Sequence, residues 1–505
     1  MFALLLALTV VAAHAPLLNH RQALPNPDEA QLLAGALTLR DRFAPWHSVD
    51  LSTAGPVSVL PLLLFPANFL GARWCAALCS AAAVAGSFLA LTATRDQPLA
   101  RVAALPVAAF YAFMQSIELF QFSTEHMAIV LLAAGAWIWM SATAAGEKSP
   151  GPGPAFVLGL CLGGAVMAKM QSSPCAAWLA AAPGVLLFLD AGLAWRRRLA
   201  TLAALVAGSV AVPLGFVLLA VAQGVLPDLL ISYGLNNVHY VTTIGSAQML
   251  SCQPAMIWGL NYLLKPVGAA LLAGLVLLPW FTPAERRTVF ILVGLLASAV
   301  FAVALPGRNS GHYWLFVLGP LLLAEGTVFM AAARGSAGLA AVPAGIPRWG
   351  LLALGPLLLA LPVAHRFTAS RDGVIATELA GVTSVQGAGE MLRTLARDGD
   401  ALTVWGWRAE LHVYSGLPQG TREAHTQWLI EPVPQRDYYR QRYLADLARI
   451  KPRFFVDAVG PRGFAYTDRA SAGHETFAAL GDLVGKQYTF LGETDAMRIY
   501  VRHVD

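Results

Sequence analysis

Long apolar segments separated by short polar loops make up most of the chain. A helix needs about 20 mainly apolar residues to cross a bilayer. We interpret the first apolar segment, residues 1–18, as a retained signal-anchor helix. Further segments lie at roughly 71–94, 100–117, 127–145, 154–171, 174–190, 199–222, 263–282, 287–305, 313–333 and 347–365. The pattern predicts a polytopic α-helical membrane protein with about eleven transmembrane helices.

Residues 19–56 form a polar first loop between the opening helix and the remaining spans. Within this loop, Asn26 is a suitable N-cap for an amphipathic helix from Pro27 to about Arg42. We expect this helix to lie along the membrane, with Gly35 on its polar side. The following apolar stretch, Val57–Leu70, is short and interrupted by prolines, so it predicts a second surface or re-entrant helix.

The composition changes at about Phe367. From there on, charged residues occur at regular intervals. Short strand-like runs at 401–405 and 453–457 alternate with helical stretches. A hairpin is expected near the end, with strands at 488–491 and 497–501. We therefore predict a membrane module at 1–366 and a soluble α/β domain at 367–505.

Composition and charge support this membrane assignment. The chain is 57% hydrophobic and only 12% charged, with a mean hydropathy of +0.59. The chain has a net charge of +5, and its basic residues include short clusters between apolar segments, which indicate cytoplasmic loops rather than a nucleic-acid surface. Applied to the predicted spans, the positive-inside rule places the N-terminus inside and the C-terminal domain outside.

The first loop carries a pair of acidic residues, Asp28 and Glu29. Both would lie in the first turn of the amphipathic helix, where the helix dipole favours negative charge. The pair is therefore either a helix cap or a catalytic carboxylate at the membrane surface. Asp50, later in the same loop, could assist either Asp28 or a metal site.

Cationic side chains are predicted on the same side of the membrane. Lys169, followed closely by Gln171, stands at the outer end of a span, where it either pairs with an anion or snorkels to the interface. Arg308, His312 and Tyr313 lie in a very short outer loop. An arginine, a histidine and a tyrosine held close together can bind a phosphate.

A carboxylate followed by an imidazole occurs at Glu125 and His126. These two could hold a divalent cation, Mg²⁺ or Mn²⁺, completed by Asp28 or Asp50. Alternatively, Glu125 caps the next helix and His126 is an interfacial histidine. Asn237 and His239, in a long outer loop, are candidates for contact with an acceptor.

The order of these motifs resembles that of a known family. Asp28-Glu29, Asp50 with Gly55-Pro56, Ser123-Thr124-Glu125-His126, Lys169-x-Gln171 and Arg308 with His312-Tyr313 precede an outer C-terminal domain. In this order they resemble the bacterial GT-C glycosyltransferases of the aminoarabinose-transferase, protein O-mannosyltransferase and Rgt-like group. The resemblance implies a sugar donor on polyprenyl phosphate, periplasmic transfer with inversion and a catalytic aspartate, which maps onto Asp28.

Such a reaction also fits the residues chemically. A single displacement needs a base for the acceptor hydroxyl and cations for the leaving phosphate. Asp28 would be the base, and Lys169 and Arg308, with His312 and Tyr313, would bind the phosphate. We expect Glu29, Asp50, Gln171, Asn237 and His239 to surround the substrates. The partners would be a lipid-linked donor and a glycan, lipid or protein acceptor at the bacterial inner membrane.

Two other functions use the same residues. A transporter or flippase of lipid-linked sugars would bind phosphate without turnover, although the chain shows no internal repeat of the kind common in transporters. A polymerase or ligase would use a diphosphate-linked oligosaccharide instead. The number of phosphates on the released lipid would separate it from the proposed transferase.

Overall fold

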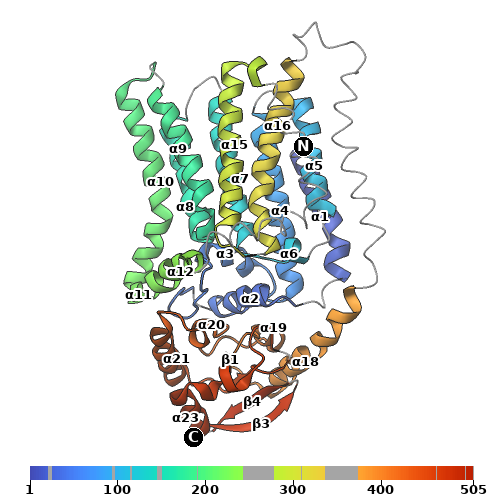
Figure 1. Ribbon diagram of the computed structural model, residues 1–505, viewed down its shortest axis with the longest axis vertical. Coiled ribbons are helices and arrows are strands. Elements are labelled where there is room, and N and C mark those ends of the chain that lie inside the picture. Colours follow the sequence, from blue (N-terminus) through green and yellow to red (C-terminus); the bar gives the residue numbers. More distant parts are fainter. Residues whose placement is uncertain are drawn as a thin grey trace.

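The computed structural model describes residues 1–20, 25–41, 43–93, 97–113, 117–144, 150–189, 192–242, 278–308, 310–335, 374–461, 463–494 and 496–503. Helices of the N-terminal part stand side by side as a bundle, and the C-terminal part forms an α/β body at one end of it (Figure 1). The N-terminus lies towards the other end of the bundle. The predicted span at 347–365, most of that at 263–282 and the predicted boundary at 366 fall outside the described residues.

Every predicted span within the described residues contains a helix. These helices are α1 Phe2–His20, α4 Phe69–Thr92, α5 Gln97–Phe113, α7 Glu125–Ala144, α8 Pro152–Ala168, α9 Ser173–Leu189, α10 Trp195–Ala222, α15 Pro283–Ala304 and α16 Leu315–Gly335. Within the described ranges, five helical segments are long and apolar enough to cross a membrane by length and composition. The protein is therefore a mostly helical, multi-pass membrane protein.

Glycines allow α8 and α10 to pack closely. A Cβ atom at Gly159 would lie 2.3 Å from the Leu205 carbonyl oxygen, and one at Gly208 would lie 2.1 Å from that of Phe156. Small residues at such contacts let membrane helices approach backbone to backbone. The outer face of α10 carries exposed apolar side chains, including Val206, Leu214 and Leu218, as expected for contact with lipid.

Short helices cover the end of the bundle nearest the C-terminal body. The structure places α2 Pro27–Leu39 across this end, with Asn26 accepting hydrogen bonds from the backbone N–H groups of Asp28 and Glu29 (Figure 1). The predicted N-cap is thus correct. The polar assignment of Gly35 is wrong, because this residue is buried and a Cβ atom there would lie 2.7 Å from Leu51.

Other short elements lie between the long helices. They are α3 Pro56–Val59, η1 Leu60–Leu64, α6 Ile117–Phe120, η2 Met170–Ser172, α11 Leu226–Asp228, η3 Leu229–Leu235, α12 Asn236–Thr242, η4 Leu278–Trp280 and η5 Gly311–Trp314. The predicted helix at 57–70 is therefore a short α-helical turn followed by a 3₁₀ segment. Its prolines restrict longer helix formation.

The C-terminal body contains a four-stranded mixed sheet in the order β1-β2-β4-β3. Its strands are β1 Leu402–Trp405, β2 Phe454–Asp457, β3 Tyr488–Thr494 and β4 Met497–Arg502. Strands β1 and β2 are parallel, whereas β4 pairs antiparallel with both β2 and β3. The predicted strands and terminal hairpin are present, with β3 longer than expected.

Helices enclose this sheet on both faces. They are α18 Val374–Leu395, α19 Glu410–Ser415, α20 Gln427–Ile430, α21 Arg436–Ile450, α22 Arg469–Ala472, η6 His474–Thr476 and α23 Ala478–Gln487. Alternate residues of β2 enter two different cores. Phe454 packs in a cluster with Leu392, whereas Phe455 packs in a cluster with Tyr443.

Candidate functional site

Asp28 is an exposed residue in the first turn of α2, at the end of the bundle covered by the C-terminal body. Among the described residues, no side chain forms a hydrogen bond or ion pair with its carboxylate. Surrounding protein desolvates the carboxyl and raises the pKa of Asp28, while the charge of His312 opposes this shift. The residue as a whole is nevertheless exposed.

Charged side chains from four other elements act electrostatically on Asp28. The charges of Glu118, Glu125, Lys169 and His312 all act on its carboxyl, and we call these five residues the Asp28 cluster. His312 Nδ1 lies 2.8 Å from Glu118 Oε2, and this hydrogen bond lowers the pKa of Glu118. Glu118 and Glu125 do not share a helix, because α6 ends before α7 begins. The charges of both nevertheless act on the Asp28 carboxyl.

Lys169 is held in place by backbone contacts from the first loop. Gly55 donates its N–H to the Ala168 carbonyl at 3.0 Å, and Ala54 forms an isolated β-bridge with Lys169. A Cβ atom at Gly55 would lie 1.9 Å from the Met167 carbonyl oxygen, so only glycine allows this approach. The Lys169 Nζ atom lies 3.7 Å from Glu125 Oε1. The first loop thus fixes the backbone at Lys169, the residue that joins α8 to the short helix η2.

A pair of tyrosines lies between Lys169 and Arg308. The hydroxyls of Tyr240 and Tyr313 are 2.7 Å apart. Arg308 stacks over the Tyr240 ring with its Cζ atom 4.2 Å from the centroid, and Lys169 Nζ lies 5.8 Å from the Tyr313 centroid. Arg308 is exposed and forms no ion pair with any described residue. Its guanidinium therefore remains available for an anion.

Glu29 faces away from this cluster. It is fully buried, with Oε2 3.2 Å from Arg73 and Oε1 accepting the Phe122 N–H at 2.9 Å. Burial raises the pKa of Glu29, whereas the charge of Arg73 lowers it. These contacts give Glu29 a role in joining α2 to α4 and to the loop before α7. The two neighbouring carboxylates of the first turn thus have different surroundings.

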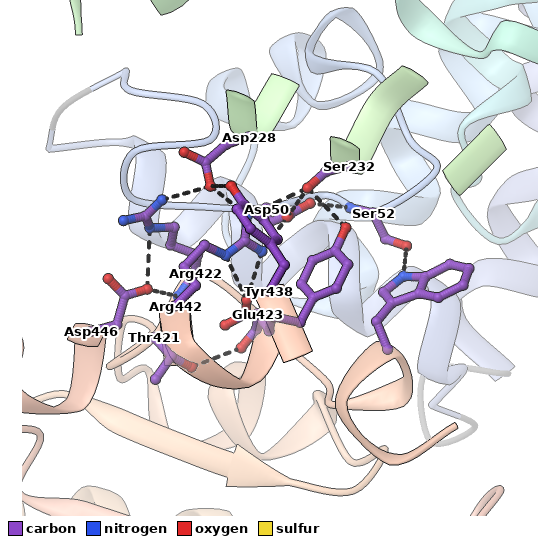
Figure 2. A network of polar contacts seen from close by, with 12 residues as sticks. Asp50, Ser52, Asp228, Ser232, Thr421, Arg422, Glu423, Tyr438, Arg442 and Asp446 are labelled. Atoms are coloured by element: carbon purple, nitrogen blue, oxygen red, sulfur yellow. Dashed lines mark hydrogen bonds and ion pairs between the residues drawn. The ribbon is translucent and has the colours of Figure 1, made fainter. Parts of the chain in front are cut away.

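Asp50 also lies outside the Asp28 cluster. Its carboxylate accepts a hydrogen bond from Ser232 and pairs with Arg442 of the C-terminal body (Figure 2). Arg442 also contacts Asp228 at 2.8 Å and Glu423 at 2.6 Å, and all these side chains are buried. We call Asp50, Asp228, Arg422, Glu423, Arg442 and Asp446 the interdomain network.

The remaining predicted residues make structural contacts. Gln171 donates its side-chain N–H to the Ala302 carbonyl at 2.8 Å, which ties η2 to α15. Asn237 donates to the carbonyls of Tyr233 and Thr53. The His239 ring lies edge-on to Trp428 of the C-terminal body, with centroids 6.3 Å apart. Asn237 and His239 therefore join α12 to the first loop and to the C-terminal body.

The fold of the chain is similar to that of solved structures. ArnT from Cupriavidus metallidurans bound to undecaprenyl phosphate matches with a TM-score of 0.57 and 13% identity, over 99% of this chain and 98% of ArnT. ArnT from the same organism in the apo state matches with a TM-score of 0.53 and 14% identity, over 94% and 93%. The chain has a GT-C fold. No protein-family model and no curated protein sequence matches it.

Within this GT-C fold, the predicted metal ligands Glu125 and His126 do not form a group of three candidate ligands in the described part of the chain. Glu125 already has an ammonium group beside it. His126 stacks on Phe122, and its Nδ1 accepts the Ser123 N–H at 3.1 Å. The His126 Nε2 atom is buried without a partner among the described residues. These contacts favour a lysine over a metal at Glu125.

A different group of potential metal ligands lies in the C-terminal body. Asp457, His474 and Glu475 place one ligand atom each within 4.8 Å of one another. Arg469 donates to Asp457 at 2.8 Å and to Glu475 at 2.9 Å. The guanidinium already supplies the positive charge that these carboxylates need. The group therefore fits an ion-pair cluster at the end of β2 better than a metal centre.

Some residues near the first loop were weak candidates in the sequence or were not predicted. Glu118 and Tyr240 were ambiguous in sequence, because isolated polar residues in outer loops are common. Arg442 lies far along the chain, in a domain whose orientation the hydrophobic pattern does not specify. No local motif distinguishes these residues, so only the tertiary structure brings them to the first loop.

Proposed function

We propose that this protein is an inverting glycosyltransferase that moves a sugar from polyprenyl phosphate to an acceptor hydroxyl. The observation that carries this proposal is the position of Asp28, an exposed residue whose carboxylate has no described partner and on which the charges of Lys169 and His312 act. A structural cap would satisfy the helix end without needing these cations nearby. A general base needs access to its substrate and a carboxylate that is free to accept a proton.

In the proposed step, Asp28 takes the proton of the acceptor hydroxyl. The acceptor oxygen forms a bond to the anomeric carbon of the sugar while the bond from that carbon to the phosphate oxygen breaks. The electron pair of the broken bond stays on the polyprenyl phosphate. Attack from the side opposite the leaving phosphate inverts the anomeric configuration, and no general acid is required.

Lys169 and Arg308 would stabilise the charge on the leaving phosphate. Tyr313 and Tyr240 lie between them, and His312 stands next to Tyr313. Fixed cations and hydroxyl groups need little reorganisation as charge develops, so they stabilise a transition state efficiently. Arg308 suits a bidentate contact with phosphate oxygens, whereas Lys169 provides a compact charge.

The membrane location suits a lipid-linked donor. The polyprenyl tail would remain in the bilayer beside the bundle, and the phosphate would reach the cations at the end of the bundle. ArnT, whose fold is similar, has been crystallised bound to undecaprenyl phosphate. We place the active end on the periplasmic side of a bacterial inner membrane, with about eleven spans, the N-terminus inside and the C-terminal domain at 367–505 outside.

Replacing Asp28 with Asn tests this proposal. Purified protein in proteoliposomes receives a radiolabelled polyprenyl-phosphate hexose, and released polyprenyl phosphate is measured with and without acceptor. Loss of the base should lower the rate by about 10²–10⁴-fold. Asp41→Asn is the matched control, because Asp41 is an exposed carboxylate in the same loop.

Each other result contradicts the proposal in a specific way. Equal rates for native protein and Asp28→Asn would exclude the base. Sugar movement across the membrane that survives Asp28→Asn, without release of polyprenyl phosphate, would identify a transporter. Turnover only of a diphosphate-linked oligosaccharide would identify a polymerase or ligase.

A further inference from the structure

An aromatic cluster lies where β1 ends in the C-terminal body. The Trp407 ring stacks on His425, with centroids 4.3 Å apart and planes 9° apart. Phe464 meets Trp407 edge-on at 5.4 Å and is 55% exposed. Trp407 Nε1 has no hydrogen-bond partner among the described residues. Unlike Trp405, which is fully buried in the domain core, Trp407 is only partly covered.

The topology places this cluster at a common ligand-binding position. Trp407 follows β1 and Phe464 follows β2, and these two strands are parallel. Ligands in open α/β sheets bind outside the carboxyl ends of parallel strands. The same edge of the sheet leads into α19, which packs against α2 (Figure 1). The aromatic cluster therefore faces the segment that carries Asp28.

A short series of contacts joins the cluster to Asp28. His425 Nε2 lies 3.0 Å from the side-chain oxygen of Gln31. Gln31 is three residues after Asp28 on α2, and residues at this spacing are neighbours on a helix surface. Asp28, Gln31, His425 and Trp407 thus follow one another from the first loop to the C-terminal body.

Glu410, three residues after Trp407, has an unused polar group. Its side chain is 1% exposed, and one oxygen lies 3.3 Å from Arg408. The other oxygen, Oε2, is buried without a partner among the described residues. Burial raises the pKa of Glu410, and the negative charge of Asp28 adds to this effect. A buried carboxylate oxygen without a partner is costly, so a ligand that donates a hydrogen bond to it would gain binding energy.

We infer that Trp407, Phe464 and Glu410 bind the acceptor, and that the acceptor is a carbohydrate. The inference rests on the proposed glycosyltransferase function and adds the class of acceptor to it. Sugar rings have an apolar face of C–H groups, which stacks on an indole, and hydroxyl groups, which donate to a carboxylate. Aromatic surface with a few fixed polar groups is the usual composition of a small-molecule site. A serine or threonine peptide would leave the aromatic face without a matching ring.

Stimulated turnover measures acceptor binding directly. Native protein in proteoliposomes is given radiolabelled polyprenyl-phosphate hexose, and release of polyprenyl phosphate is followed as soluble acceptors are added. The carbohydrate probes are octyl glucoside below its micellar concentration, lactose and N-acetylchitobiose. The competing probe is a short amidated peptide that contains serine and threonine. We expect the carbohydrates, and not the peptide, to stimulate release and to become glycosylated.

Two variants locate the binding site. Trp407→Ala should raise the probe concentration for half-maximal stimulation about tenfold, and Trp407→Phe should recover most of the affinity. Glu410→Gln should also weaken the probe while keeping the size of the side chain. In each variant the half-saturating concentration of the acceptor should change more than that of the donor. Phe490→Ala is the control, because Phe490 is an exposed aromatic residue on β3.

The outcomes separate the two proposals. If no polyprenyl phosphate is released and Asp28→Asn has no effect, the transferase function itself fails. If the donor turns over with Asp28 but only the peptide stimulates, or no carbohydrate does, the carbohydrate acceptor is wrong. If carbohydrates stimulate native protein, Trp407→Ala and Phe490→Ala equally, the acceptor binds elsewhere. Thermal unfolding of each variant identifies any that fail to fold.

Discussion

The Asp28 cluster and the interdomain network both contain several charged side chains around the first loop, but they pair these charges differently. In the interdomain network, Arg442 contacts three carboxylates, and each of them lies within 3 Å of it (Figure 2). In the Asp28 cluster, Lys169 Nζ lies 3.7 Å from the Glu125 carboxylate, and the Asp28 carboxylate has no described partner. Charges that satisfy one another hold a fold together, whereas incompletely paired charges can bind a substrate.

The two clusters are connected through the first loop. Asp50 anchors the start of a segment whose end, at Ala54 and Gly55, contacts the backbone around Lys169. The interdomain network can therefore position the Asp28 cluster. Substitutions in the network should change stability first, and those in the cluster should change turnover first.

The largest effect on stability is expected for Arg442→Met. Removing the guanidinium would leave the buried carboxylates of Asp50, Asp228 and Glu423 without their shared partner. Breaking a buried pair by removing one partner costs about 3–5 kcal/mol. The free energy of unfolding in detergent, from denaturant titration, checks this value.

Arg449→Met is the matched control on the same helix. Arg449 is 47% exposed and pairs with Asp446 at 2.8 Å. An exposed pair of this kind contributes at most about 1 kcal/mol. Equal stability of Arg442→Met and Arg449→Met would contradict a structural role for the interdomain network.

Arg308→Met tests the functional cluster with little effect on folding. Because Arg308 is exposed, its loss should leave stability nearly unchanged. A charge-assisted hydrogen bond contributes about 1.5–3 kcal/mol, so the half-saturating donor concentration should rise roughly 10–100-fold. Arg287→Met, at the other end of α15, is the control. Unchanged donor affinity in Arg308→Met would remove Arg308 from the phosphate site.

Gly55→Ala should disturb the connection between the clusters. The added methyl group would lie 1.9 Å from the Met167 carbonyl, so the loop or the end of α8 must move. We expect a loss of about 1–3 kcal/mol in stability, as for other overpacked sites, and weaker donor binding through Lys169. Denaturant titration and donor saturation curves measure the two effects. A variant with native stability and donor affinity would show that Lys169 does not depend on this contact.

The smallest effect is expected in the pH profile of turnover. Asp28 must be deprotonated to act as a base, and its pKa is raised. Activity should therefore rise with pH through a value above the usual aspartate pKa of about 3.9, and fall below it. Rates measured across pH 4–8, with folding followed in parallel, check this. An acidic limb at or below the usual value would contradict desolvation of Asp28.

The sequence predicted the helices well, because each apolar segment and each capping residue is a local feature. Asn26 and the strand-like runs of the C-terminal domain illustrate this. It could not predict that Asp50 joins the C-terminal body, since its partner Arg442 lies on α21 nearly four hundred residues later. A polar residue in a loop looks the same whether it binds a substrate or a second domain.

The candidate site shows the same division. Asp28, Lys169, Arg308 and His312 were recognisable because charges next to membrane spans are costly and therefore conspicuous. Glu410 and Trp407 were not, because aromatic and acidic residues are ordinary in a soluble domain. Their proposed role depends on the packing of α19 against α2, and no periodic pattern in the sequence predicts that contact.

The most direct test of the central claim is an experimental structure of the protein with polyprenyl phosphate, determined in lipid nanodiscs by electron cryomicroscopy. We predict that the phosphate lies between Lys169 and Arg308, within hydrogen-bonding distance of both, with the Asp28 carboxylate facing the space beside it. A phosphate bound elsewhere, with Lys169 still paired only to Glu125 and Arg308 still in solvent, would contradict the account.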